Sequence, residues 1–177
     1  MIETGRLLLR PPAAADRPWL RRLLDDPEAM AMIGPRRSPA ECDDVLDRHL
    51  GWFERHGYGF MAVLRREDGM GIGFCGLKPG AENTPIEGEV EIGWMLFPAH
   101  WRCGFGYEAA TALLDWGWAT TSAARICAIT SAINTPSRAL MVRLGMAQLP
   151  GGEFVSTRFD PADVRAQSVT YAVARPA

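Results

Sequence analysis

The sequence predicts an α/β (α+β) fold in which one mixed sheet of about seven strands carries helices on both faces. Segments with strand and helix patterns follow one another in the order strand, helix, helix, three strands, helix, strand, helix and two strands. At the centre, residues 89 to 119 form a continuous unit of strand, short glycine-containing loop and helix. Because the 177 residues contain no repeat or linker, we expect a single domain over 1–177.

The first part of the chain predicts one strand and two helices. Arg6 to Arg10 is typical of a strand, and two prolines end it. Asp16 is a candidate N-cap for the first helix, which has a proline in its first turn. Prolines and a glycine interrupt residues 25–37, which predicts a loop or a short turn. Ser38 to Glu41 forms a capping box, so we expect a second helix from there to Gly57.

A hairpin and four further elements complete the predicted sheet. Gly59 to Arg66 and Met70 to Lys78 flank an Asp-Gly pair, which favours a tight turn. Glycines in the second of these strands indicate a bulge or a close backbone contact. Beyond the central unit we expect a strand over 125–131, a helix over 134–145 with Gly145 as its left-handed C-cap, and strands over 153–159 and 167–173.

Composition argues against several classes of function. A net charge of −2 gives no reason to expect nucleic-acid binding or a basic membrane surface. The N-terminal leucine run is far shorter than a signal peptide core or a membrane span. The four cysteines lack paired spacing and the three histidines form no ligand cluster, so we expect no metal. Scattered cysteines fit a reducing compartment, and we expect a cytoplasmic protein.

The central unit has the geometry of an anion site. Glu89 to Phe97 is a predicted strand that Pro98 ends, Trp101 to Gly106 is a loop, and Tyr107 to Ala119 is a predicted helix. The first amides of a helix have no internal partner, and the helix dipole places partial positive charge there. Glycines let the backbone approach a ligand, and Arg102 adds a full charge. These features favour a bound diphosphate.

Two common diphosphate motifs are absent from this loop. It lacks the GK[ST] ending of a nucleoside-triphosphate P-loop, so no lysine or Mg²⁺-binding hydroxyl is supplied. It also lacks the GxGxxG pattern of a dinucleotide site with an acidic residue downstream. The alternative is a tight turn that only packs the helix against the sheet.

The stretch EIGWMLFPAHWRCGFGYEA resembles the acetyl-CoA-binding motif of the GNAT superfamily of N-acetyltransferases, most closely its RimJ/RimL-type branch. Arg102 and Cys103 stand where the branch usually has Gly-Lys, so one glycine is lost and a cation is kept. The resemblance implies a GNAT fold with a mostly antiparallel sheet and acetyl-CoA as co-substrate. It implies that loop amides hold the diphosphate and that pantetheine lies along the strand. The residues implied in cofactor binding here are Met95, Leu96, Phe97, Trp101, Arg102, Cys103, Gly104, Phe105, Gly106 and Tyr107.

A second stretch, NTPSRALMVRLGM, resembles the family's N-x-x-S-x-x-x-x-x-K/R-L-G element. Asn134 is placed to cap a helix, and Ser137 and Arg138 share its face. An ordinary capped amphipathic helix is the alternative, but two motifs in the family's order favour the functional interpretation. The resemblance adds Asn134, Ser137, Arg138 and Arg143 to the cofactor-binding residues.

The family's chemistry implies roles for four residues. Many GNAT enzymes have a tyrosine that protonates the leaving thiolate, but Met141 occupies that position, and the resemblance points to Ser137 and the Asn134-capped helix instead. The Leu96 amide is a candidate oxyanion donor. Glu91 is a candidate general base acting through water, or else it pairs with a surface arginine. Cys127 could form an acetyl-enzyme, although direct transfer in a ternary complex is the family's usual route.

The resemblance implies an amine acceptor, either a protein N-terminus or a small molecule. It places the acceptor cleft at residues 30–37, Trp52 and the loop before Glu89. Ser168 stands where the branch usually has a histidine, so chemistry on that side departs from the family pattern. A catalytically silent acyl-CoA sensor is the alternative, motivated by the missing tyrosine, and a homodimer is common in the branch. Acceptor identity is not encoded in these patterns.

Overall fold

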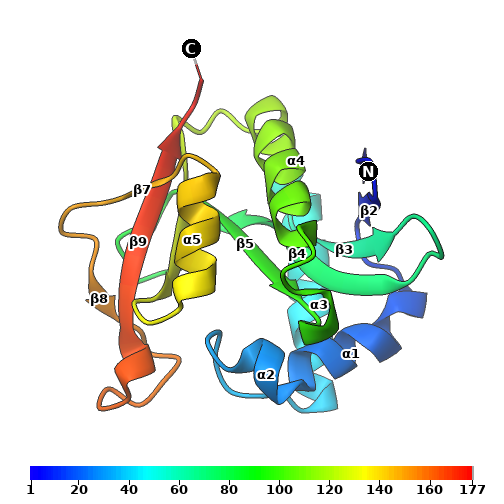
Figure 1. Cartoon of the computed structure of the whole chain (residues 1–177), viewed down its shortest axis with the longest axis horizontal. Coiled ribbons are helices and arrows are strands. Elements are labelled where there is room, and N and C mark those ends of the chain that lie inside the picture. Colours follow the sequence, from blue (N-terminus) through cyan, green and yellow to red (C-terminus); the bar gives the residue numbers. More distant parts are fainter. Residues whose placement is uncertain (177) are drawn as a thin grey trace.

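The computed structural model describes residues 1–176, which form one nine-stranded sheet with helices on both faces (Figure 1). The strands lie in the order β1-β2-β3-β4-β5-β6-β9-β7, and β8 pairs with β9. All neighbouring pairs are antiparallel except β5 and β6, which are parallel. The predicted α/β class and the mixed, mostly antiparallel sheet are confirmed.

Nine strands form where about seven were predicted. Their bounds are β1 Ile2–Glu3, β2 Leu7–Arg10, β3 Phe60–Arg65, β4 Gly71–Pro79, β5 Val90–Leu96, β6 Arg125–Ser131, β7 Ala147–Gln148, β8 Phe154–Val155 and β9 Gln167–Ala174. The two additional strands, β1 and β7, are two-residue edges too short to leave an alternating pattern. The strand predicted over 153–159 is wrong beyond Val155: the Ser156 amide still bonds to the Ala166 carbonyl at 2.8 Å, but Ala166 belongs to a 3₁₀ turn, Val164–Ala166, so β9 provides no further strand to pair with.

The helices are α1 Arg17–Asp25, α2 Pro27–Met30, α3 Pro39–His56, α4 Phe105–Thr120 and α5 Thr135–Arg143. α3 begins with the predicted capping box at Ser38 and ends at Gly57, whose φ is 75°. α2 is a single helical turn in the stretch predicted as a loop or a short turn, and the Asp26 carboxylate caps it by accepting hydrogen bonds from the Glu28 and Ala29 amides at 2.9 and 2.8 Å.

Asp16 precedes α1, but its carboxylate does not cap that helix. It is buried and accepts hydrogen bonds from the Arg10 guanidinium at 2.6 and 3.0 Å and from the Ala13 amide at 2.7 Å. Asp16 therefore occupies the predicted N-cap position, but its side chain makes no capping hydrogen bond. The carboxylate joins the end of β2 to the start of α1 instead.

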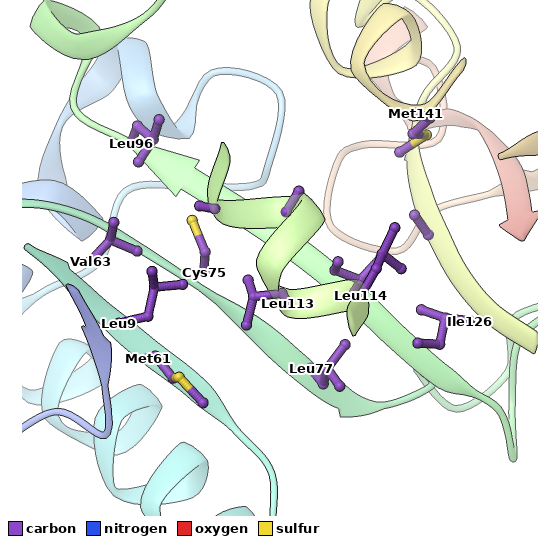
Figure 2. Packing of buried hydrophobic residues seen from close by; sticks show 14 of the residues in the cluster. Leu9, Met61, Val63, Cys75, Leu77, Leu96, Leu113, Leu114, Ile126 and Met141 are labelled. Atoms are coloured by element: carbon purple, nitrogen blue, oxygen red, sulfur yellow. The ribbon is translucent and has the colours of Figure 1, made fainter. Parts of the chain in front are cut away.

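The core has a layer on each face of the sheet. On one face, α4 places Leu113 and Leu114 over β4 and β5, close to Leu77 and Cys75 (Figure 2). On the other face, α1 and α3 pack Leu20, Leu23 and Leu46 against Phe74 of β4 and Met95 of β5. Because both faces of β5 are buried, its position is fixed by packing on two sides.

Glycines in β4 allow the close contacts that the sequence indicated. A Cβ on Gly73 would lie 2.2 Å from Leu96 Cδ2, and one on Gly71 would lie 2.4 Å from the Trp19 ring. The ladder between β3 and β4 also shifts register between Val63 and Leu64. The glycine at position 73 therefore lets the Leu96 side chain settle onto β4 at the end of β5.

Within residues 1–176, no helix is long and apolar enough to cross a membrane. No group of three or more histidine, cysteine or acidic side chains there is arranged to hold a metal ion. Cys42, Cys75, Cys103 and Cys127 are all free thiols.

Candidate active site

β5 and β6 diverge in the middle of the sheet. Their parallel ladder contains only two pairs, Val90 with Ile126 and Glu91 with Cys127, whereas β5 stays paired with β4 as far as Leu96. We call the divergence after Glu91 the fork. Beyond it, the edge of β5 that faces β6 has no strand beside it, so main-chain groups on that edge are free to bind a ligand.

The Leu96 amide points into the fork. The Phe97 amide donates to the Ile72 carbonyl of β4 at 3.0 Å, and backbone groups alternate sides along a strand. The amide and carbonyl of Leu96 therefore face the opposite side, away from β4. The Leu96 carbonyl accepts a hydrogen bond from Trp101 Nε1 at 2.9 Å, which ties the loop to the end of β5.

The loop before α4 presents free amides. α4 begins at Phe105, after Gly104, whose φ is 81° and which provides no side-chain cap. The first intrahelical bond runs from the Glu108 amide to the Gly104 carbonyl at 3.1 Å. The amides of Phe105, Gly106 and Tyr107 thus have no helical acceptor and lie at the positive end of a 16-residue helix. The predicted start at Tyr107 was two residues late.

Arg102 adopts a left-handed backbone without being glycine. Its φ is 59°, which costs about 1–2 kcal/mol for a residue with a side chain. Arg102 and Cys103 are both exposed, and the Cys103 thiol lies 3.3 Å from the Trp101 carbonyl. Arg102, which stands at a glycine of the GNAT motif, therefore keeps a backbone conformation that glycine favours. Such strain is typical of a ligand site.

An ion pair that the sequence did not predict holds this loop from behind. Arg6 donates from Nε to Glu108 Oε2 at 2.7 Å and from Nη1 to the Cys103 carbonyl at 3.0 Å. Its guanidinium carbon lies 4.4 Å from the Phe105 ring centroid. Burial opposes ionisation of Glu108, but hydrogen bonds from Thr4 and Arg6 outweigh it and lower the pKa of this carboxyl. The N-terminal segment thereby fixes both the loop and the first turn of α4.

α5 forms the other wall of the site. Asn134 caps it, with Oδ1 accepting from the Ser137 amide at 3.4 Å and Nδ2 donating to Thr130 at 3.0 Å. A Cβ on Gly106 would lie 3.6 Å from Leu140 of α5 and 3.7 Å from Leu96 of β5. The start of α4, the end of β5 and α5 thus meet at Gly106.

The side chains of α5 differ in what they can reach. The Ser137 hydroxyl is half-buried and makes no hydrogen bond within residues 1–176. Arg143 lies on the Tyr107 ring, 3.8 Å from its centroid. Arg138 instead donates to the Tyr171 hydroxyl at 3.2 Å and to the Ala132 carbonyl at 2.9 Å, so much of its guanidinium is used within the fold. Met141 is buried in the core (Figure 2).

Glu91 forms a buried ion pair with Lys78, the one lysine of the chain. The two residues are direct partners in the β4–β5 ladder, and their side chains are 6% and 14% exposed. Burial lowers the pKa of Lys78 although the Glu91 carboxylate opposes that shift. The alternative of a surface arginine as the partner of Glu91 is wrong, because the strand register brings Lys78 to it.

His49 of α3 packs near this pair. Its Nδ1 accepts a hydrogen bond from the Phe60 amide at 3.2 Å, and its ring touches Trp52, Phe60 and Phe74. Burial lowers the pKa of His49 to about 3, so the imidazole is neutral. Nothing in the sequence around His49 predicted this contact, which depends on the packing of α3 under the sheet.

Cys127 lies opposite Glu91 at the fork and is fully buried. Burial, together with the charge of Glu89, raises the pKa of its thiol to about 11. Because the thiolate is the nucleophile, this environment disfavours an acetyl-cysteine. Elsewhere on the predicted acceptor side, Met30 is a core residue rather than part of a pocket.

Comparisons with known proteins identify the family of the chain. Residues 6–147 match a family model described as an acetyltransferase (GNAT) domain. An uncharacterized N-acetyltransferase, p20, from Bacillus licheniformis is 31% identical over 146 residues, which cover 79% of this chain and 78% of that protein.

Solved structures share the fold. An acetyltransferase from Agrobacterium tumefaciens is 29% identical, with a TM-score of 0.80 over 98% of this chain and 94% of that chain. RimL, an alpha-N-protein acetyltransferase of a ribosomal protein, was solved in complex with coenzyme A. It superposes with a TM-score of 0.78 over 97% of this chain and 95% of that chain, and at 17% identity it shows likeness of fold alone.

Proposed function

The chain belongs to the GNAT acetyltransferase family, and we propose that it transfers the acetyl group of acetyl-CoA directly to a primary amine within a ternary complex. Family membership makes it an acetyl-CoA-dependent acyltransferase. We assign it to the RimJ/RimL-type branch, with a protein N-terminal α-amine or a small-molecule amine as acceptor. The main support is that the free amides at the start of α4 and the Leu96 end of β5 meet at Gly106.

The donor is held mainly by main-chain groups. The amides of residues 104–107 bind the diphosphate of acetyl-CoA at the positive end of α4, and Arg102 and Arg143 add charge at the rim. Residues 95–97 line pantetheine through their backbone, because the Met95 side chain is buried on the opposite face. Trp101 keeps the loop against β5 through its bond to Leu96. Arg138 acts on this site by fixing α5 against Tyr171.

The Leu96 amide polarises the thioester carbonyl. A donor fixed in the sheet needs no reorganisation when negative charge develops on the oxygen, and removing one such donor typically costs about 3–4 kcal/mol. The amide lies on the free edge of β5 beyond the fork, where an acyl group can approach it from the β6 side.

The state of Glu91 favours an acceptor of low pKa. Glu91 is the candidate base acting through water, but Lys78 already shares its carboxylate. The ion pair occupies part of the carboxylate that a bridging water would need. An α-amino group titrates near 7.7–8.0 and needs little help, whereas a lysine side chain titrates near 10.4. The ion pair therefore favours an α-amine over a lysine ε-amine.

Ser137 is the group available to the leaving thiolate. Its hydroxyl is free in the first turn of α5, and Asn134 holds that turn in place. Met141 is buried and has no proton to donate. Serine is a poor acid by pKa, so we assign Ser137 a hydrogen bond to the sulfur rather than full proton transfer.

Free-thiol release from acetyl-CoA, measured over a panel of amines and N-terminal peptides, tests this function. We expect Ser137→Ala to lower kcat about tenfold and to leave the Kd for acetyl-CoA unchanged, since a hydrogen bond to a charged sulfur contributes about 1.5–3 kcal/mol. Thr135→Ala, two residues away on the exposed start of α5, is the matched control. Saturable acetyl-CoA binding with no thiol release over the panel would instead indicate an acyl-CoA sensor.

We also propose that residues 1–177 constitute one acetyltransferase domain that works in the cytoplasm. The nine strands form a single continuous sheet from the N-terminal to the C-terminal segment. The four free thiols are typical of a reducing compartment.

A further inference from the structure

Three arginines without a carboxylate partner gather on the α3 face of the sheet. Within residues 1–176, Arg37, Arg48 and Arg158 form no ion pair, whereas arginines such as Arg17, Arg21 and Arg165 are each paired with aspartate. Arg37 lies between α2 and α3, Arg48 on α3, and Arg158 between β8 and β9. We call these three residues the arginine cluster.

Contacts between the segments bring the cluster together. Arg165 Nη1 donates to the Ala31 carbonyl at 3.3 Å, which joins the β8–β9 segment to the segment after α2. A Cβ on Gly34 would lie 3.8 Å from Arg158 Cβ. Arg48 lies over the Trp52 ring, 5.7 Å from its centroid. Arg48 is exposed, yet partial desolvation and the charges of Arg37 and Arg158 lower its pKa, so both of these arginines act on Arg48.

The cluster borders the fork from the side opposite α4, because His49, the neighbour of Arg48 on α3, packs on Phe60 with ring centroids 4.5 Å apart, and a Cβ on Gly93 of β5 would lie 2.6 Å from the Phe60 ring. Burial is the main reason that the pKa of Lys78 is lowered, and the charges of Arg158 and Arg48 add to it. Lys78 in turn is bound to Glu91, at the last rung of the β5–β6 ladder. α4 and α5 cover the other face of the sheet (Figure 1). The cluster therefore lies across the sheet from the free α4 amides.

Acidic side chains nearby do not neutralise the cluster. Glu91 is ion-paired with Lys78, and Asp43 is ion-paired with Arg17 and Arg21. Asp44 attracts Arg48 and Glu41 attracts Arg37 electrostatically, but neither carboxylate forms an ion pair with the cluster, and Ser38 holds that of Glu41. Like charges held close without counter-ions raise the local potential and attract an anion.

We infer that the acceptor amine also bears a carboxylate, which the arginine cluster binds while the amine lies at the fork; this rests on the proposed function. Arginine suits this task because its planar fork of donors matches a carboxylate. The same charges repel a polycationic acceptor, so the cluster selects against polyamines as well as for acidic acceptors.

Matched acceptor pairs test the inference. One pair is an N-terminal peptide with Asp and Glu at its second and third positions and the same peptide with Lys at both. The other is a free amino acid and its carboxamide, which separates a small-molecule carboxylate from an acidic peptide. We expect kcat/KM to be at least tenfold higher for the anionic member of one pair, and the preference to shrink in 0.5 M NaCl because salt screens charge.

Substitutions in the arginine cluster test whether these residues cause the preference for an anionic acceptor. We expect Arg48→Ala and Arg158→Ala each to raise KM for the preferred acceptor about tenfold, with the KM for acetyl-CoA unchanged. Arg158→Glu should reverse the order of the peptide pair. Arg55→Ala, an exposed arginine two turns further along α3, is the control and should change nothing. Circular dichroism checks that each variant is folded.

Two results overturn the inference and leave acetyl transfer standing. One is faster thiol release with the Lys peptide or with spermidine than with either anionic acceptor. The other is a folded Arg48→Ala/Arg158→Ala double variant whose KM for the anionic acceptor equals that of the wild type. The absence of thiol release with every amine, whatever its charge, would overturn the proposed function itself.

Discussion

The two sides of the fork use different parts of the chain to meet a ligand. On the donor side, residues 101–107 offer main-chain amides from one continuous segment. On the acceptor side, the ionic groups are side chains from β4, β5, α3 and two loops: Lys78, Glu91, Arg37, Arg48 and Arg158. A backbone site tolerates changes of side chain but not of backbone conformation, whereas a side-chain site responds to single changes of charge. The following predictions use that difference.

The largest expected effect is on the acceptor side. Lys78→Met leaves the Glu91 carboxylate buried without its partner, and we expect the free energy of unfolding to fall by about 3–5 kcal/mol in urea titrations. The double variant Lys78→Met/Glu91→Leu removes both charges and should recover most of that loss. A single variant as stable as the wild type would mean that water already solvates this pair.

On the donor side, backbone conformation should matter more than charge. Gly104 has a φ of 81°, which a β-branched residue adopts only with strain, so we expect Gly104→Val to weaken acetyl-CoA binding about 100-fold in calorimetry. Gly88 also has a φ of 81° with open space around it, and Gly88→Val is the matched control. Equal Kd values for acetyl-CoA in the two variants would mean that this loop does not bind the cofactor.

The buried His49, on the acceptor side of the fork, should make the stability of the protein depend on pH. Burial holds its folded pKa near 3, below the unfolded value of about 6.5, so only the unfolded state gains a proton as pH first falls. Stability is therefore complete above about pH 6.5 and lost toward pH 3, with about 2 kcal/mol lost between pH 7 and pH 5. Urea titrations of His49→Gln should lack this loss. If His49→Gln loses stability between pH 7 and pH 5 as the wild type does, His49 is not the group responsible.

The smallest expected effect concerns the support of the donor loop. Arg6→Ala removes the bonds to Glu108 and the Cys103 carbonyl, and we expect the Kd for acetyl-CoA to rise about tenfold, or about 1.4 kcal/mol. Arg36→Ala, which removes an exposed pair with Asp25, is the control. If both variants bind alike, the loop holds its shape without Arg6.

Local patterns explain what the sequence predicted well. The unit from β5 through the loop to α4 is contiguous, so its strand pattern, glycines and helical spacing all lie in one window. The capping box at Ser38 and the left-handed Gly57 likewise bounded α3 correctly. The sequence did not decide between a loop and a short turn at α2, because its cap, Asp26, follows directly on α1 and stands in a stretch broken by prolines.

Long-range contacts explain what the sequence did not predict. Lys78 meets Glu91 through the register of two strands joined by a ten-residue segment, and no local pattern fixes that register. Arg6 reaches Glu108 across 102 positions. His49 finds the Phe60 amide only once α3 packs beneath β3 and β4. Each is a polar side chain whose partner is chosen by tertiary packing rather than by neighbours in sequence.

Amide NMR of the ¹⁵N-labelled protein during an acetyl-CoA titration tests the central claim most directly, because it observes the proposed donors themselves. We predict the largest shift changes at Gly104, Phe105, Gly106 and Tyr107, and a further change at Leu96 that acetyl-CoA produces and 3′-phosphoadenosine 5′-phosphate does not. Saturation with acetyl-CoA that leaves these five amides unmoved would contradict the account.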